Sequence, residues 1–261
     1  MFVDSDDYIE PDTLSRYKQS ISASDVYYVQ DYFINKPGLE WKVSFPRRKE
    51  KIYLADALAA LMSRYHNSVG YIWHCLFNAK IVNDRHIRFN ENLQFGEDAV
   101  FAFLYLQHMS KGMFIPYLSY HYCDDNPVSI TKTVSFNPEQ HYILLREIVT
   151  ASKQVLLQAE PGRSATVIKS YVMRLLLRGM IYLESTDLPV REEFYRKICS
   201  LYDTTLSPGK TITELMYRAK YEGYSKSLAV AVKKEYGKIK VERNVKRQRV
   251  IDKLHNLLRI F

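Results

Sequence analysis

The sequence is poor in cysteine and has no long hydrophobic run, and each of these features excludes a class of protein. Its three cysteines, Cys75, Cys123 and Cys199, are odd in number and widely spaced, which argues against a disulfide framework and indicates a reducing compartment. No Cys/His spacing typical of a zinc site is present. No apolar run is long enough to cross a bilayer, and no signal-peptide pattern opens the sequence. These absences predict a cytoplasmic, globular protein.

What the sequence does have is ample length and an uneven positive charge. Its 261 residues are enough for a sizeable core and two domains. The net charge of +8 favours anionic partners, namely nucleotide phosphates, acidic lipid or nucleic acid. Acidic residues gather near the start, whereas residues 233–259 are dense in lysine and arginine. The 21 tyrosines suit aromatic pockets for sugars, and they equally suit an ordinary core.

Hydrophobic spacing predicts strands mainly in the first half of the chain and helices in the second. A strand over residues 25–34, a turn at 35–38 and a strand over 41–45 make a hairpin, and a further strand pair is expected over 112–116 and 117–122. The expected helices are 13–20, 53–65, 99–109, 137–159, 164–184, 189–203, 210–222, 225–236 and 239–258. The pattern therefore predicts an α/β part and a helical part, with a boundary near residue 135.

The most informative stretch is residues 2–12, FVDSDDYIEPD. Two apolar residues run into three carboxylates, and the Glu-Pro-Asp that follows suits the first turn of a helix. The pattern predicts the end of a buried strand, a tight acidic turn and then a helix. Ligands of open α/β sheets bind beyond the carboxyl ends of strands, so Asp4, Asp6 and Asp7 would lie at that edge. Clustered carboxylate oxygens suit Mg²⁺ or Mn²⁺.

Four interpretations of this acidic turn compete. An EF-hand loop fails, because it needs Gly at its sixth position and Glu at its twelfth, where Ile9 and Ser15 stand. A phosphatase of the haloacid dehalogenase type also has Asp-x-Asp, but its pattern puts Thr or Val where Tyr8 stands. The third interpretation is the Asp-x-Asp motif of nucleotide-sugar glycosyltransferases. The fourth is a capped turn with solvated acids, and the residues alone leave it open.

A second group of acids, Glu97-Asp98, stands where a loop becomes a helix. Unpaired N–H groups at a helix start favour the ionised carboxylate. An ionised carboxylate beside a bound sugar can take the proton from an attacking hydroxyl. The alternative is that these acids only stabilise the helix, as acids commonly do at this position.

Two more segments accompany the acidic motifs. The run Trp73…Phe77-Asn78…Ile81 precedes the Glu-Asp pair, which itself follows Gly, and Ser129-Ile130-Thr131 follows a Tyr-rich strand. Together the four pieces, spread over residues 1–133, resemble family 2 glycosyltransferases of a large bacterial branch. The resemblance implies an incomplete GT-A-like (Rossmann-like) sheet with flanking helices, followed by a C-terminal all-helical region. It makes 1–135 the metal- and acceptor-binding part and 136–261 a helical domain.

The resemblance also implies a reaction, the inverting transfer of a sugar from a nucleotide-sugar donor to a glycan or lipid-linked acceptor. Asp4 and Asp6 would bind the donor and, with His121, a Mn²⁺ or Mg²⁺ ion that stabilises the departing diphosphate as a Lewis acid. Asp98 would be the general base, with Glu97 beside it orienting the acceptor.

Two of the implied roles have plainer alternatives. Trp73 would stack on the acceptor sugar, but a buried Trp of the core explains it equally well. His121 stands in an alternating strand, where simple packing is the alternative to metal binding.

The resemblance lacks one part of the family's pattern. The family places alternating strands and helices, which hold the nucleobase and ribose, before the Asp-x-Asp motif, and a parallel strand needs such neighbours. Here the motif follows Met1 almost at once. We therefore expect a truncated enzyme that is inactive alone and binds UDP-sugars weakly. The rival hypothesis is a non-catalytic remnant that acts as an interaction or membrane-surface module.

The C-terminal stretch, residues 233–261, is basic and carries a loose apolar stripe. One hypothesis is a bundle helix with a solvated basic face. The other is peripheral contact with anionic lipid at the inner face of the membrane, which would suit bacterial polysaccharide biosynthesis on a membrane-linked glycan. No helix-turn-helix, zinc-finger or RNA-binding signature is present, so no nucleic-acid partner is expected.

Overall fold

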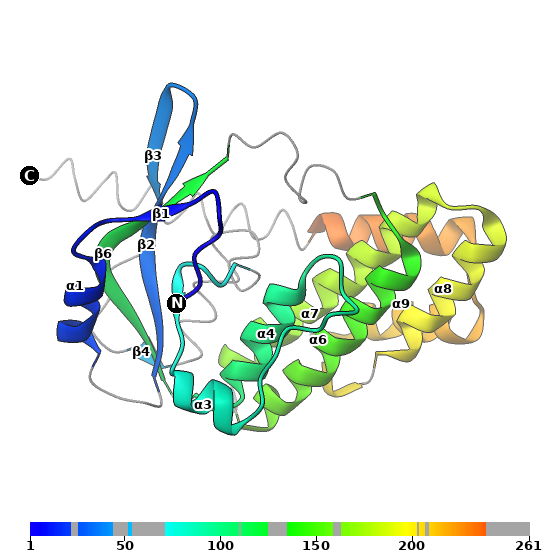
Figure 1. Ribbon diagram of the computed structural model, residues 1–261. Coiled ribbons are helices and arrows are strands. Elements are labelled where there is room, and N and C mark those ends of the chain that lie inside the picture. The colour runs from blue at the N-terminus through cyan, green and yellow to red at the C-terminus, as the bar shows by residue number, and fades with distance from the viewer. Residues whose placement is uncertain are drawn as a thin grey trace, which may run out of the picture. The chain divides into compact units, whose positions relative to one another are not determined.

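A mixed β-sheet organises the first part of the chain, and helices make up the second (Figure 1). The structure is a computed structural model that describes residues 1–21, 26–43, 52–53, 71–109, 111–124, 135–158, 163–202, 204–206 and 209–238. The chain divides into two compact units, one formed by Met1–Phe136 with Arg146–Ile168 and the other by Asn137–Leu145 with Lys169–Phe261. The α/β class with a following helical region is therefore confirmed.

Six strands of the described residues form the sheet, in the order β1–β6–β2–β3, with β4 paired to β6 and β5 to β2. The strands are β1 (Tyr8–Ile9), β2 (Val26–Lys36), β3 (Leu39–Val43), β4 (Ile52–Tyr53), β5 (Cys75–Leu76) and β6 (Lys111–Cys123). β2 and β6 run parallel in the middle, and the other pairs are antiparallel. β2 and β3 form the predicted hairpin, which turns at Gly38 with a φ of 73°.

The strand pair expected over 112–116 and 117–122 is wrong, because one strand, β6, covers both segments. β6 pairs with β2 along its length, and the register shifts between Gln30, opposite Ile115, and Asp31, opposite Leu118. Pro116 stands at this shift. Proline has no N–H for the ladder, so it fits a strand at a bulge, and the irregularity lets the strand continue past it.

The chain's first residues also differ from expectation. Residues 1–4 form no strand. Instead the Phe2 ring packs edge-on against the rings of Phe89 and Phe101, each with its centroid 5.3 Å away. The strand of this region, β1, comes after the acidic turn and pairs antiparallel with β6. The apolar lead-in is thus anchored by aromatic packing rather than by a ladder.

Two helices of the first unit position acidic motifs. Helix α1 (Thr13–Ser20) follows the acidic turn with the bounds the sequence predicts. Helix α4 (Glu97–Leu106) begins directly after Gly96, whose φ of 76° is a left-handed conformation that favours glycine. Since Val100 and Phe101, close to the start of α4, are each only 2% exposed, the helix start is held by the core. The helix predicted over 99–109 is confirmed with an earlier start.

Apart from a short helix over residues 79–84, which the hydrophobic spacing did not predict, the remaining α-helices match the periodic pattern of the sequence. The remaining helical segments are α3 (Ala79–Asp84), α6 (Pro138–Gln158), α7 (Arg163–Tyr182), the 3₁₀ turns η2 (Leu183–Ser185) and η3 (Thr204–Leu206), α8 (Leu188–Ser200), α9 (Lys210–Tyr221) and a helix over residues 226–238. Asp187 caps α8 by accepting the Val190 N–H at 3.2 Å, with Pro189 in the first turn. α8 packs against α9.

Some predictions lie outside the described residues. They are the helix over 53–65 apart from Tyr53, which is in β4, the helix over 239–258, and the Ser129–Thr131 segment. Among the helices that the structure describes, none has the length and apolar content needed to span a membrane.

Candidate functional site

The acidic turn is closed by its own backbone and fastened to β6. The Asp7 N–H donates to the Asp4 carbonyl at 3.1 Å, which makes residues 4–7 a tight turn. The Tyr120 hydroxyl accepts the Asp4 N–H at 3.2 Å and donates to Asp7 Oδ2 at 2.5 Å. The other Asp7 oxygen, Oδ1, accepts the Cys123 N–H at 2.8 Å. The turn therefore has a defined shape although most of it is exposed.

Burial and neighbouring charges raise the pKa values of two acids of the turn, Asp4 and Asp7. The pKa of Asp4 lies above its usual value because of desolvation first, and then because of the charges of Asp7, Asp6 and Glu97. The pKa of Asp7 is also raised, mainly by desolvation, although the hydrogen bonds from Cys123 and Tyr120 oppose the shift. Since Asp4 interacts with Glu97, the two acidic motifs lie within electrostatic reach of each other.

Asp98 is the most strongly perturbed acid of the site. Burial raises its pKa to about 7, and the charges of Glu97 and Asp4 add to the rise, while a hydrogen bond from the Ile72 N–H opposes it. The expectation that the helix start would favour the ionised form is thus wrong in direction, because desolvation and like charge outweigh the helix N-terminus. A carboxyl with this pKa exchanges protons readily near neutral pH.

Trp73 lies in the core. Its side chain is 3 % exposed, and its ring stacks on Tyr120 at 4.7 Å and on Tyr122 at 5.3 Å, with Tyr32 edge-on at 4.6 Å. Acceptor stacking by Trp73 stays a prediction that this packing does not favour. In the structure the ring supports the strand that carries Tyr120.

His121 is not brought to Asp4 and Asp6. Successive side chains of a strand point to opposite faces, so His121 faces away from the side on which its neighbour Tyr120 holds the acidic turn. Its ring is stacked between Tyr8 at 4.2 Å and Phe33 at 4.4 Å. Its Nε2 is 2.8 Å from Glu10 Oε1. The predicted metal role for His121 has no partner carboxylate from the Asp-x-Asp motif.

The fold has relatives of known structure. No protein-family model matches the sequence, and no curated protein matches it. The chain is similar to the crystal structure of S. aureus TarS 1–349 in complex with UDP-GlcNAc, with a TM-score of 0.60 and 15% identity over 95% of this chain and 67% of that chain. The TarS complex with UDP gives a TM-score of 0.57, again at 15% identity, over 95% of this chain and 66% of that chain.

The fold is GT-A-like. The chain spans about two thirds of the length of the TarS chains it matches. The likeness confirms the predicted fold class, a mixed sheet with flanking helices and a helical C-terminal region.

The carboxylates of this GT-A-like unit provide hard oxygen ligands. In the part of the chain that the structure describes, no three His, Cys, Asp or Glu side chains are gathered as a ligand set. Mg²⁺ is often held by one or two carboxylates together with substrate phosphates. The carboxylates of Asp4 and Asp6, two residues apart in the acidic turn, are ligands of the type that such an ion takes.

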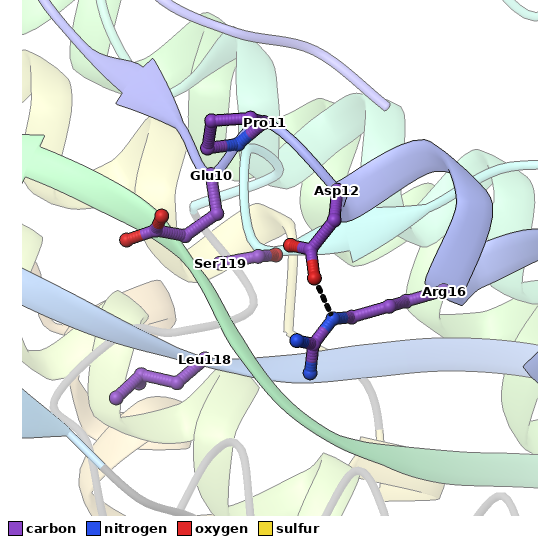
Figure 2. Close-up of a pocket in the computed structure, with 6 residues that line it drawn as sticks. All are labelled: Glu10, Pro11, Asp12, Arg16, Leu118 and Ser119. Atoms are coloured by element: carbon purple, nitrogen blue, oxygen red, sulfur yellow. Dashed lines mark hydrogen bonds and ion pairs between the residues drawn. The ribbon is translucent and has the colours of Figure 1, made fainter.

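A hollow of about 400 Å³ lies elsewhere, between the start of α1 and β6 (Figure 2). It is lined by Glu10, Pro11, Asp12, Arg16, Leu118 and Ser119. Asp12 and Arg16 form an ion pair, and Glu10 contacts His121, so the charges lining the hollow already have partners. None of the predicted site residues lines it. The acidic turn and the start of α4 are the stronger candidate, because burial and then neighbouring charges raise the pKa values of Asp4 and Asp98, and perturbed acids gather at functional sites.

Sequence reasoning missed Tyr120 and the separate task of Asp7. Asp7 stood among three neighbouring acids, and nothing distinguished it from Asp4 and Asp6. Tyr120 belongs to an alternating strand more than 110 residues away, at a sequence separation of 113 from Asp7. No local sequence pattern predicts the contact between Tyr120 and Asp7.

Proposed function

We propose that this chain takes part in inverting glycosyl transfer from a UDP-sugar class donor to a hydroxyl of a glycan or lipid-linked acceptor. Asp98 would accept the proton of the attacking hydroxyl, with Glu97 orienting the acceptor. Asp4 and Asp6 would hold a Mn²⁺ or Mg²⁺ ion on the donor's diphosphate. When bound, such an ion stabilises the leaving diphosphate as a Lewis acid. The GT-A-like fold shared with UDP-GlcNAc-bound TarS supports this donor class.

The observation that carries the proposal is the electrostatic contact between Asp98 and Asp4. These acids come from motifs 94 positions apart, yet the charge of Asp4 helps raise the pKa of Asp98 to about 7. A general base is most effective when its pKa is near the working pH. A capped, solvated turn would give no such coupling.

A pH titration of the Asp98 carboxyl carbon by NMR tests the coupling. The midpoint should lie at about 7. Asp4→Asn should lower it, because the substitution removes one of the charges that raise it. Asp84→Asn is the matched control, since Asp84 pairs with Lys80 at 2.6 Å and does not contribute to the shift. Equal midpoints in wild type and Asp4→Asn would separate the motifs and remove the proposal's basis.

Titration with Mn²⁺ and UDP, then with UDP-GlcNAc, tests the donor side. Asp6→Asn should weaken the Mn²⁺-dependent binding, whereas Asp12→Asn, an acid engaged by Arg16, should not. Tight, micromolar binding would contradict the expectation of weak donor affinity. Binding that ignores Asp6 would place the ion elsewhere.

A non-catalytic interaction module is the second candidate. The observation that favours it is that two predicted site side chains are engaged in packing: Trp73 is 3% exposed, and His121 is stacked between Tyr8 and Phe33. Under this hypothesis neither UDP nor Mn²⁺ binds. Sedimentation with acidic-lipid vesicles would then test membrane contact by the basic residues 233–261.

A further inference from the structure

The hydroxyl of Tyr120 lies between the two ends of the acidic turn, Asp4 and Asp7. Tyr120 Oη accepts the N–H of Asp4, where the turn begins, at 3.2 Å. It also donates to Oδ2 of Asp7, where the turn ends, at 2.5 Å. The turn is closed between the same two residues by its own 3.1 Å backbone hydrogen bond. The tyrosine thus holds both ends of the segment that contains Asp6.

The Asp7 side chain fixes the end of the turn to β6. One of its oxygens accepts from Tyr120, and the other accepts from the Cys123 N–H at 2.8 Å. Both oxygens are therefore engaged by β6. The carboxylate of Asp4, by contrast, makes no hydrogen bond or ion pair within the described residues. The division of labour leaves Asp4 available to a ligand and Asp7 occupied with structure.

The hydroxyl is itself well anchored. Tyr120 is fully buried, and its ring stacks on Trp73 at 4.7 Å with an interplanar angle of 17°. Tyr122 stacks on the same indole at 5.3 Å and 5°. Its hydroxyl, however, makes no hydrogen bond to any residue that the structure describes. The strand therefore offers two tyrosines with the same support, of which one holds the turn.

We propose that Tyr120 is a positioning residue whose hydroxyl sets the geometry in which Asp4 and Asp6 meet a divalent cation. The inference rests on the proposed function for its cation, but not for the contact itself. Hydrogen-bonded partners behind metal ligands orient them, and removing such partners typically costs about 10-fold to 100-fold in metal affinity. Tyr120 would do this through the backbone of Asp4 and the side chain of Asp7.

The test compares Tyr120→Phe with Tyr122→Phe in the full chain. The first readout is exchange of the Asp4 and Cys123 amides. Tyr120→Phe should raise the exchange rate of both amides by about fivefold, because this is the change expected from the loss of one ordinary hydrogen bond. Tyr122→Phe should leave both rates unchanged. The second readout is Mn²⁺ affinity in the presence of UDP, followed by the EPR signal of the free ion. It should fall about 10-fold to 100-fold in Tyr120→Phe alone.

The outcomes separate the inference from the proposed function. Equal amide exchange in the two variants overturns the role of Tyr120, whatever the chain binds. Faster exchange with unchanged Mn²⁺ affinity overturns positioning of the cation. A wild-type chain that binds no Mn²⁺ with UDP contradicts the proposed function and this inference together. If Tyr120→Phe fails to fold, a wild-type NOE between the Tyr120 hydroxyl proton and the Asp4 amide supports the contact, and its absence overturns it.

Discussion

Different interactions stabilise each of the two units of this chain internally. In the first unit, buried polar groups connect segments far apart in sequence: the hydroxyls of Tyr17 and Ser119 meet over Gln30, and Tyr120 holds Asp7. In the second unit, aliphatic side chains such as Leu177 and Met180 are fully buried in a helical core. The first unit therefore depends on a few specific long-range hydrogen bonds, and the second on repeated apolar spacing.

This difference decides where chemistry can lie. Converging acids with raised pKa values, Asp4, Asp7 and Asp98, all belong to the first unit. Holding like charges together opposes folding, and it persists where surrounding structure fixes it. The second unit shows mostly exposed ion pairs one helical turn apart, such as Lys197 with Glu193 at 2.8 Å, which contribute little.

The largest expected effect is on chemistry, and it is confined to the first unit. Asp98→Asn should reduce any Mn²⁺-dependent UDP release from UDP-GlcNAc by about 10²-fold to 10⁴-fold, because it removes the proposed general base. Its stability should not fall, since the substitution removes a carboxyl whose ionisation burial disfavours. The release assay with a parallel thermal melt checks both. Asp84→Asn is the control, and undiminished release in Asp98→Asn would show that another group is the base.

Core truncation should separate the two units by spectroscopy. Phe103→Ala in the first unit and Leu177→Ala in the second each remove a fully buried side chain, at a cost of about 3–5 and 2–5 kcal/mol. Both tryptophans of the sequence, Trp41 and Trp73, belong to the first unit, so their fluorescence reports on it. Phe103→Ala should shift the fluorescence transition most, and Leu177→Ala the far-UV circular dichroism. Identical shifts by both probes would mean one cooperative unit.

The same contrast explains what the sequence predicts. Apolar spacing and breakers such as Pro189 indicate the helices of the second unit, because each helix is specified by its own residues. The spacing cannot identify a partner strand, so the Phe2–Val3 lead-in was wrongly expected to be a strand, and Pro116 was wrongly interpreted as a strand end. The meeting of Asp4 with Asp98 came from resemblance to a family. No pattern predicted the contact of Tyr120 with Asp7.

Acid should weaken the second unit more than the first. Burial lowers the pKa of His74 to about 3 and of His141 to about 4. In the unfolded chain each histidine has a pKa of 6.5. Between pH 6.5 and the lowered pKa, the unfolded chain therefore binds more protons than the folded protein, and each histidine lowers the free energy of unfolding by about 1.4 kcal/mol per pH unit. In the first unit Asp98 opposes this loss, because burial raises its pKa in the folded protein to about 7, above the unfolded value of 3.8. As the pH falls between these two values, the folded protein binds more protons than the unfolded chain, which stabilises the folded state.

Urea unfolding at about pH 7 and about pH 5 measures this difference, with tryptophan fluorescence and circular dichroism as probes of the two units. The dichroism midpoint should fall more than the fluorescence midpoint. In Asp98→Asn the opposing contribution is gone, so the fluorescence midpoint should then fall as well. A fluorescence midpoint that ignores Asp98→Asn would contradict the compensation.

The smallest effects come from glycines of the second unit. A Cβ on Gly179 would lie 2.9 Å from His141 Nε2 and 2.9 Å from Leu145 Cδ1, so Gly179→Ala should destabilise by about 1–3 kcal/mol through overpacking. Gly237 lies in the helix over 226–238, and no contact within 4 Å is found for such a Cβ among the residues that the structure describes, so Gly237→Ala should stabilise by about 0.5–1 kcal/mol. The circular-dichroism melt should therefore move in opposite directions for the two substitutions, while tryptophan fluorescence changes less. A Gly179→Ala variant as stable as wild type would mean that the helices of this unit can separate slightly without loss, and that its core is less tightly packed than its buried side chains indicate.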